Sequence, residues 1–147
     1  MNNTTIKNDT YTENRNHCKA IADDLEKYYN GNVYRCLECG EIITKNDDGV
    51  LYCDYCKKEI EPDDADQLSL YDYFTEDIFD IEYSIGGDGE YRGVRLMVAC
   101  GGPNIYIDTL EKAVMLYWWG ERASYPIDYD VIEDIDNIWE ENYNCTK

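Results

Sequence analysis

Basic residues and histidine are scarce in this sequence. Lysine and arginine number 13 against 32 aspartates and glutamates, and the formal net charge is −19. There is one histidine, His17, and the sequence contains no recognisable Ser-His-Asp set or phosphate-binding glycine loop. A chain this acidic repels nucleic acids and anionic membranes. We therefore predict a protein that is not an enzyme and that has neither a membrane nor a nucleic acid as its direct partner.

Long apolar runs are also absent. No run approaches the ~20 residues that a helix needs to cross a bilayer, and no signal-peptide pattern opens the sequence. Seven cysteines, an odd number that includes two Cys-x-x-Cys pairs, are typical of a reducing compartment in which thiolates bind metal. We therefore expect a cytoplasmic location.

Two Cys-x-x-Cys pairs are the most specific motif of the chain. The pairs are Cys36 with Cys39 and Cys53 with Cys56, and residues 40–52 separate them. Each such turn presents two sulfur atoms to one ion, and a hairpin between the turns completes a tetrahedral site for Zn²⁺. Four protein ligands leave no coordination position for a substrate, so the spacing predicts a structural zinc ribbon. The alternative interpretation is four buried cysteines without a metal.

The first half of the chain is predicted to hold a helix and this ribbon. Residues 1–16 are polar, which favours a disordered arm, and apolar side chains recur at helical spacing from Cys18 to Tyr29. We assign residues 17–60 to a helix plus zinc-ribbon module and residues 61–68 to an acidic linker. Short strands are expected at 33–35, 42–44 and 50–52.

Residues 69–147 are predicted to form an acidic α+β domain. A short helix capped by Ser69 precedes a meander of strands, and a final helix spans residues 128–143. The strands are expected at 79–85, 91–100, 104–109 and 113–119. The fold class is therefore α+β: an N-terminal helix and a small Cys₄ zinc ribbon, followed by a four-stranded antiparallel β-meander flanked by helices.

The negative charge is concentrated in the second half. Residues 1–60 hold 11 acidic and 8 basic side chains, whereas residues 61–147 hold 21 and 5. In the last helix seven carboxylates fall within about 20 Å, which is one charge per roughly 3 Å. Phosphates lie at a similar spacing, ~3.4 Å, along one strand of duplex DNA. The pattern predicts a surface that imitates nucleic acid; the alternative is a solvated face that only promotes solubility. The candidate partner-binding residues are Asp128, Asp130, Glu133, Asp134, Asp136, Glu140 and Glu141 in the helix, and Asp63, Asp64 and Asp66 in the linker.

Two further features carry weaker signals. Cys100 precedes a Gly-Gly-Pro turn, but His17 lies near the other end of the sequence, so a strand end is favoured over a catalytic thiol. Trp118 and Trp119 are adjacent, so in a strand they would point to opposite faces. One is expected in the core, and the other is expected either beneath a helix or exposed, where it would suit a protein interface.

Two further stretches are YRGVRLMVACGGPNIYIDT over residues 91–109 and YWWG over residues 117–120. Together they resemble a group of small acidic proteins of unknown function carried by phages and mobile elements of Firmicutes-type bacteria. The resemblance covers residues 69–143, approximately, and not the ribbon. It implies no catalytic residue. Proteins in that setting are often inhibitors of host defence, such as anti-CRISPR or anti-restriction proteins, so the resemblance implies a partner in a bacterial host cell.

The charge and the resemblance together lead to one hypothesis. The acidic domain would occupy the basic nucleic-acid groove of a bacterial defence nuclease and block it by competition. The alternative is a regulator whose zinc ribbon contacts nucleic acid or a transcription complex while the acidic domain recruits another protein.

Overall fold

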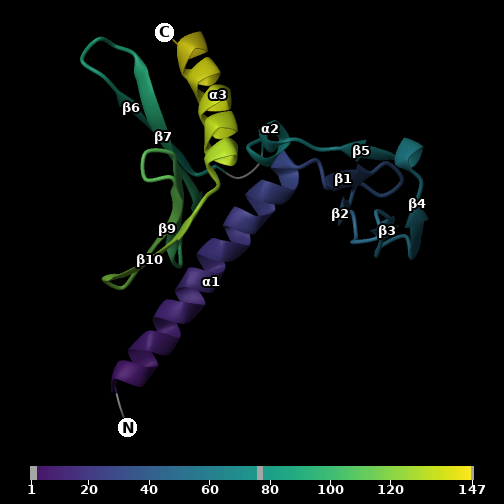
Figure 1. Ribbon diagram of the computed structural model, residues 1–147, viewed down its shortest axis with the longest axis horizontal. Helices are drawn as coiled ribbons and strands as arrows, with labels where there is room; N and C mark the ends of the chain where they lie inside the picture. The colour runs from purple at the N-terminus through teal and green to yellow at the C-terminus, as the bar shows by residue number, and fades with distance from the viewer. Residues whose placement is uncertain (1–2, 76–77, 147) are drawn as a thin grey trace. The chain divides into compact units, whose positions relative to one another are not determined.

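The computed structural model describes residues 3–75 and 78–146 and shows an α+β protein (Figure 1). It consists of an N-terminal helix, a cluster of four cysteines between short hairpins, a five-stranded antiparallel sheet and a C-terminal helix. The chain divides into two compact units. The ribbon unit is Leu25–Thr75, and the sheet unit is Met1–Asp24 together with Glu76–Lys147. No helix among the described residues is long and apolar enough to cross a membrane.

The first helix, α1 (Asn3–Tyr29), is longer than the sequence predicts. A disordered arm was expected over residues 1–16, but this segment is helical from Asn3 onward. In the sheet unit the guanidinium carbon of Arg15 lies 4.7 Å from the centroid of the Tyr125 ring. That contact joins residues more than a hundred positions apart, so the local composition of the arm does not reveal it.

The ribbon unit is built from short strands and turns. Its elements are β1 (Val33–Cys36), β2 (Ile42–Thr44), β3 (Leu51–Cys53), β4 (Lys58–Ile60), the 3-10 helix η1 (Pro62–Asp64), β5 (Ala65–Gln67) and α2 (Leu70–Tyr73). β1 pairs antiparallel with β2 and with β5, and β3 pairs antiparallel with β4. The three strands predicted in this region correspond to β1, β2 and β3, whereas β4 and β5 were not predicted.

The predicted linker, residues 61–68, is part of the ribbon unit. In β5 the Cα partner of Ala65 is Cys36, and the backbone N–H of Leu68 donates to the carbonyl oxygen of Val33 at 2.8 Å. The strand to which this segment pairs lies about thirty residues earlier in the sequence. Its acidic composition indicated a solvated linker, but the backbone hydrogen bonds of β5 make it the third strand of a sheet.

The sheet unit holds five strands instead of the four predicted. They are β6 (Asp80–Ile85), β7 (Tyr91–Ala99), β8 (Asn104–Asp108), β9 (Ala113–Trp118) and β10 (Glu121–Pro126). Their order across the sheet is β10-β9-β8-β7-β6, so each strand pairs with its neighbour in sequence. The unpredicted strand is β10, which follows a two-residue turn at Trp119 and Gly120. That turn lacks the Asn-Gly sequence that usually signals a hairpin.

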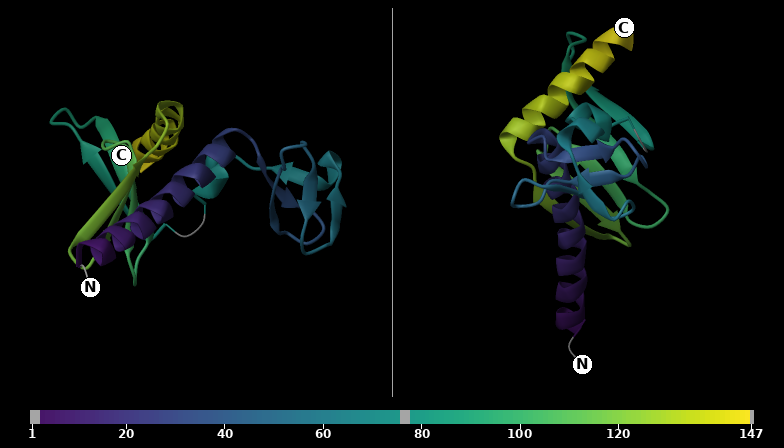
Figure 2. Two further views of the ribbon diagram at one scale, coloured as in Figure 1. Left: turned by 60° about the horizontal axis from the view of Figure 1, so that its bottom comes forward. Right: turned by 90° about the vertical axis from the view of Figure 1, so that its right-hand side faces the viewer.

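Helices cover one face of this sheet (Figure 2). Leu96, Ile107 and Val114 are direct cross-strand partners on that face, and all three are fully buried. Tyr125, the next partner in the same row, is the ring beneath Arg15 of α1. The C-terminal helix α3 (Tyr129–Thr146) packs on β7 and has as its buried residues Val131, Ile132, Ile135 and Trp139. The core of the unit therefore lies between this sheet face and the helices, as the apolar pattern of α3 predicts.

Candidate metal centre and acidic helix

The four cysteines lie in two turns of the same shape within the ribbon unit. Cys36 ends β1 and Cys53 ends β3, and the second cysteine of each pair lies in the turn that follows. In the first turn the N–H of Gly40 donates to the carbonyl oxygen of Cys36 at 2.8 Å. In the second, the N–H of Lys57 donates to the carbonyl oxygen of Cys53 at 2.8 Å. Equivalent hydrogen bonds therefore fold both Cys-x-x-Cys segments into knuckles with the sulfurs on one side.

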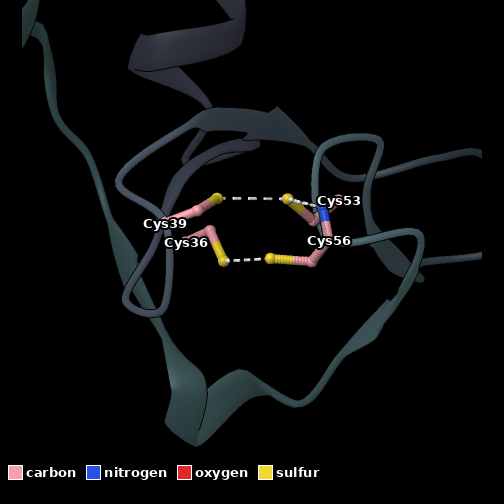
Figure 3. Close-up of side chains that lie close together, drawn as sticks. All are labelled: Cys36, Cys39, Cys53 and Cys56. Carbon is pink, nitrogen blue, oxygen red and sulfur yellow. Dashed lines mark hydrogen bonds between the residues drawn. The ribbon is translucent and has the colours of Figure 1, made fainter.

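The four sulfur atoms converge from the two knuckles (Figure 3). All of them lie within 4.8 Å of one another. The Sγ atoms of Cys36 and Cys56 are 4.0 Å apart, and those of Cys39 and Cys53 are 3.5 Å apart. A tetrahedral ion with metal–sulfur bonds of ~2.3 Å requires sulfur separations of about 3.8 Å. The cluster is therefore suited to a four-coordinate metal ion, and every coordination position is supplied by protein.

The residue after the second cysteine of each knuckle has a left-handed backbone. Gly40 has φ +81° and Lys57 has φ +60°. Glycine adopts this conformation without steric cost, whereas a side chain there costs roughly 1–2 kcal/mol. The second knuckle keeps the same shape as the first in spite of that cost, which indicates that the position of the cysteines governs the local backbone.

The thiols of the cluster do not ionise equally by themselves. A hydrogen bond from the backbone N–H of Cys39 lowers the pKa of Cys36 to about 7. Burial and the neighbouring sulfur atoms raise the pKa of Cys56 above its ordinary value. Thiolates this close repel one another, so a bound dication is what allows all four to lose their protons together.

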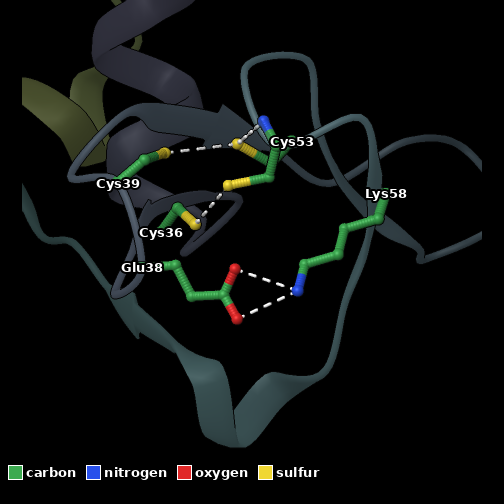
Figure 4. Close-up of polar contacts among 6 residues, drawn as sticks. Cys36, Glu38, Cys39, Cys53 and Lys58 are labelled. Atoms are coloured by element: carbon green, nitrogen blue, oxygen red, sulfur yellow. Dashed lines mark hydrogen bonds and ion pairs between the residues drawn. The ribbon is translucent and has the colours of Figure 1, made fainter.

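An ion pair joins the two knuckles at the surface (Figure 4). Nζ of Lys58 lies 2.9 Å from each carboxylate oxygen of Glu38. Lys58 also lowers the pKa of Glu38 through this hydrogen bond and its charge. Both side chains are about half exposed, so we assign the pair a role in aligning the knuckles and little net energy.

The apolar core around the cluster is small. Apart from the cysteines Cys36 and Cys53, its buried members are Ile43, Leu51 and Ile60. In the part of the chain that the structure describes, the four cysteines are the only group of three or more His, Cys, Asp or Glu side chains whose ligand atoms converge in this way. The acidic residues form no second group of that kind there.

Most predicted acidic residues of the last helix are exposed on α3 or just before it. Asp128, Asp130, Glu133, Glu140 and Glu141 are exposed, and Asp134 is half-buried. None of these side chains takes part in an ion pair of the described residues. The helix also contains no lysine or arginine. It therefore presents one sign of charge.

Asp136 has an internal partner. The hydroxyl of Tyr91 on β7 donates to its Oδ1 at 2.6 Å, and both side chains are partly buried. Burial, followed by this hydrogen bond, raises the pKa of Tyr91 above its ordinary value. The sequence placed Asp136 with the surface acids because it follows them in the helix, but the structure gives it a role in docking α3 on the sheet.

The predicted linker acids belong to the ribbon unit. Asp63 and Asp64 lie in η1 and Asp66 lies in β5, and all three are exposed. They therefore sit in a different unit from the acids of α3.

Comparisons with known protein families, with curated protein sequences and with solved structures find no match to this chain.

Proposed function

We propose that this chain is a non-enzymatic binding protein whose acidic helix α3 occupies the basic nucleic-acid groove of another protein and blocks it. The observation that carries the proposal is the charge of α3. Its 18 residues include six carboxylates and no base. Among the described residues, none of these carboxylates except Asp136 has a partner in an ion pair or in a side-chain hydrogen bond. Fold stability alone does not favour this arrangement, because like charges three and four residues apart repel one another.

The spacing of these charges supports mimicry of a polynucleotide. The six carboxylates of α3 lie between Asp130 and Glu141, a rise of about 16.5 Å, so they are spaced on average at ~3.3 Å along the axis. Phosphates repeat every ~3.4 Å along one DNA strand. The carboxylates of α3 therefore resemble, in the sign of their charge and closely in their spacing, the phosphates that a groove lined by lysine and arginine holds. The net charge of −19 adds long-range attraction to a basic protein and opposes direct binding of nucleic acid.

The ribbon unit holds a structural Zn²⁺ ion in this proposal, bound by Cys36, Cys39, Cys53 and Cys56. Its thiolate ligands and tetrahedral spacing suit zinc among the common metals. The partner class follows from the resemblance of residues 69–143 to small phage and mobile-element proteins. We therefore propose a defence nuclease in the cytoplasm of a bacterial host, of the CRISPR or restriction type.

The test begins with capture of the nuclease. Full-length zinc-loaded protein is immobilised and exposed to a lysate of a bacterium that carries CRISPR and restriction nucleases. Bound protein is eluted with duplex DNA in one arm and with high salt in the other, and the captured nuclease is then purified and assayed for DNA cleavage. We expect this chain to inhibit cleavage, and we expect the inhibition to weaken as DNA or salt is added.

Two charge variants then locate the binding surface. One neutralises α3 and the other removes the same number of exposed carboxylates from the ribbon unit. The α3 variant carries Asp130→Asn, Glu133→Gln, Asp134→Asn, Glu140→Gln and Glu141→Gln. The control carries Glu41→Gln, Asp47→Asn, Asp48→Asn, Glu59→Gln and Glu61→Gln. We expect the α3 variant to lose affinity at least tenfold and the control to change little. Equal affinity of the two variants, or a complex insensitive to salt, would refute the proposal.

A further inference from the structure

The tip of the β9–β10 hairpin exposes two tryptophans. Trp119 is 84% exposed and Trp118 is 36% exposed. Their rings form an edge-to-face pair with centroids 5.5 Å apart. Trp139, the third tryptophan of the sequence, is buried in α3. The sequence suggested that one of the adjacent pair packs in the core, but Trp119 lies in the turn and neither ring is buried.

Trp119 adopts a backbone conformation that its side chain disfavours. Glu121 pairs with Trp118, so the connecting loop consists of Trp119 at φ +52° and Gly120 at φ +76°. Two consecutive positive φ values define a turn for which asparagine followed by glycine is preferred. A bulky residue with positive φ is an outlier, and such strain persists where function requires it. Folding therefore does not explain a tryptophan at this position, and its exposure leaves its ring available to a partner.

The two rings border an open hollow of about 640 Å³. Its other walls include Asn104, Tyr117, Glu121 and Arg122. Glu121 is the cross-strand partner of Trp118, and Arg122 is the partner of Tyr117. Successive side chains of a strand point to opposite faces, so Glu121 shares the strand face of Trp118 and Arg122 shares that of Tyr117. The tryptophan side of the hollow is therefore aromatic and anionic.

We infer that this hairpin tip is a docking site for an arginine or lysine side chain of a basic protein. A cation is attracted to the face of an indole ring, and tryptophan is the best aromatic residue for this contact. The half-buried carboxylate of Glu121 supplies the opposite charge beside the ring. The chain already uses the same contact internally, since the guanidinium carbon of Arg95 lies 3.8 Å from the centroid of the Tyr106 ring. A net charge of −19 selects a positively charged partner.

The inference rests on the proposed function in one respect, which is that the partner is basic. The hairpin adds an aromatic anchor that a purely electrostatic mimic does not need. Aromatic side chains placed at an interface typically contribute more binding energy than the charges around them. The hairpin therefore favours a basic protein over other positively charged molecules as the binding partner.

The test uses full-length zinc-loaded protein and a synthetic probe. The probe is a nine-residue peptide of alternating arginine and glycine, and the control peptide replaces each arginine by citrulline, which has the same shape and no charge. Indole N–H signals are followed by NMR during titration. We expect the arginine peptide to shift the signals of Trp118 and Trp119 but not that of Trp139, and we expect the citrulline peptide to shift none of them.

The matched variant is Trp119→Asn. It restores the preferred Asn-Gly turn, so we expect its melting temperature to equal or exceed that of the parent chain. We expect its affinity for the arginine peptide to fall about fivefold. Unchanged affinity, equal binding of the citrulline peptide, or shifts at Trp118 and Trp119 no larger than at Trp139 would each overturn the inference.

The α3 charge variant separates this inference from the proposed function. At saturating arginine peptide we expect that variant to show the same indole shifts, because the hairpin is intact. If the variant inhibits the nuclease as well as the parent chain does while Trp119→Asn still weakens peptide binding, the mimicry proposal fails and the docking site stands. Loss of the indole shifts in the α3 variant counts against the docking site.

Discussion

Removal of the metal should unfold the ribbon unit and leave the sheet unit folded. The perturbation is Cys39→Ser, or a strong chelator added to the parent chain. Either change would deprive the cluster of the zinc ion that we propose it binds, and without a dication the four thiolates repel one another. The two units have separate cores, since Ile43, Leu51 and Ile60 are buried around the cysteines while the sheet unit is held by its own helices and strands.

The magnitude follows from the size of the ribbon core. Burial of a large aliphatic side chain contributes ~1.5–3 kcal/mol, so its three aliphatic residues contribute about 5–9 kcal/mol. Binding of a structural zinc ion by such ligands contributes ~10–16 kcal/mol near neutral pH. The metal term is therefore the larger one, and the small core does not hold the strands without it.

The assay combines zinc content, amide NMR spectra and thiol labelling. We expect close to one zinc per chain, and after chelation we expect the amide signals of β1–β5 to collapse while those of β7–β9 keep their dispersion. In the metal-loaded chain, Cys100 and Cys145 should react quickly because both are exposed. Cys18 should stay unreactive because burial raises its pKa to about 11. Chelation should then make the four knuckle thiols reactive as well.

The control variant is Cys145→Ser, which removes an exposed thiol outside the cluster. It should keep full zinc content and the full spectrum. The reasoning is refuted if purified protein from zinc-supplemented cells contains no metal, or if Cys39→Ser retains the dispersed signals of the ribbon unit.

Two further predictions concern stability. Gly40→Ala should lower the free energy of unfolding of the ribbon unit by about 1 kcal/mol, and Lys57→Gly should raise it by a similar amount, because both positions have positive φ. Chemical denaturation measures both changes, and the control is Gly87→Ala, because Gly87 has open space around it and no positive φ. Folding raises the pKa of Tyr91 above its ordinary value of 10, mainly through burial and also through its hydrogen bond to Asp136. The unfolded chain therefore releases this proton first, and stability should decline as pH rises above 10. Tyr91→Phe should be less stable at neutral pH and show a shallower decline, and an equal decline in both proteins would contradict this assignment.

The cluster of four cysteines was predictable from the sequence because the spacing within each pair is local. Each Cys-x-x-Cys turn fixes two sulfur atoms by short-range backbone geometry, and only the closure of the two turns depends on the fold. The buried face of α3 was predictable for a similar reason, since a helix repeats every 3.6 residues and its apolar positions follow that period.

Three failures of prediction concern pairings between distant residues, whereas β10 was missed because its short turn lacks the Asn-Gly signal. β5 was assigned to a linker because its pairing with β1 is invisible in its own acidic composition. Asp136 was assigned to the surface because the hydroxyl that binds it comes from β7, 45 residues earlier. The part of α1 around Arg15 was assigned to a disordered arm because the Tyr125 ring that it contacts lies more than a hundred residues later in the sequence.

Sequence patterns were sufficient to predict the cluster of four cysteines, the amphipathic helix α3 and the excess of negative charge in the second half of the chain. The folded structure was needed to show that Asp136 has an internal partner, which segment completes the ribbon sheet, and that the hairpin tip presents two tryptophans. The physical reason is that knuckles, helical periods and net charge depend on neighbours along the chain. Hydrogen-bond partners and exposure depend on residues that only the folded chain brings together.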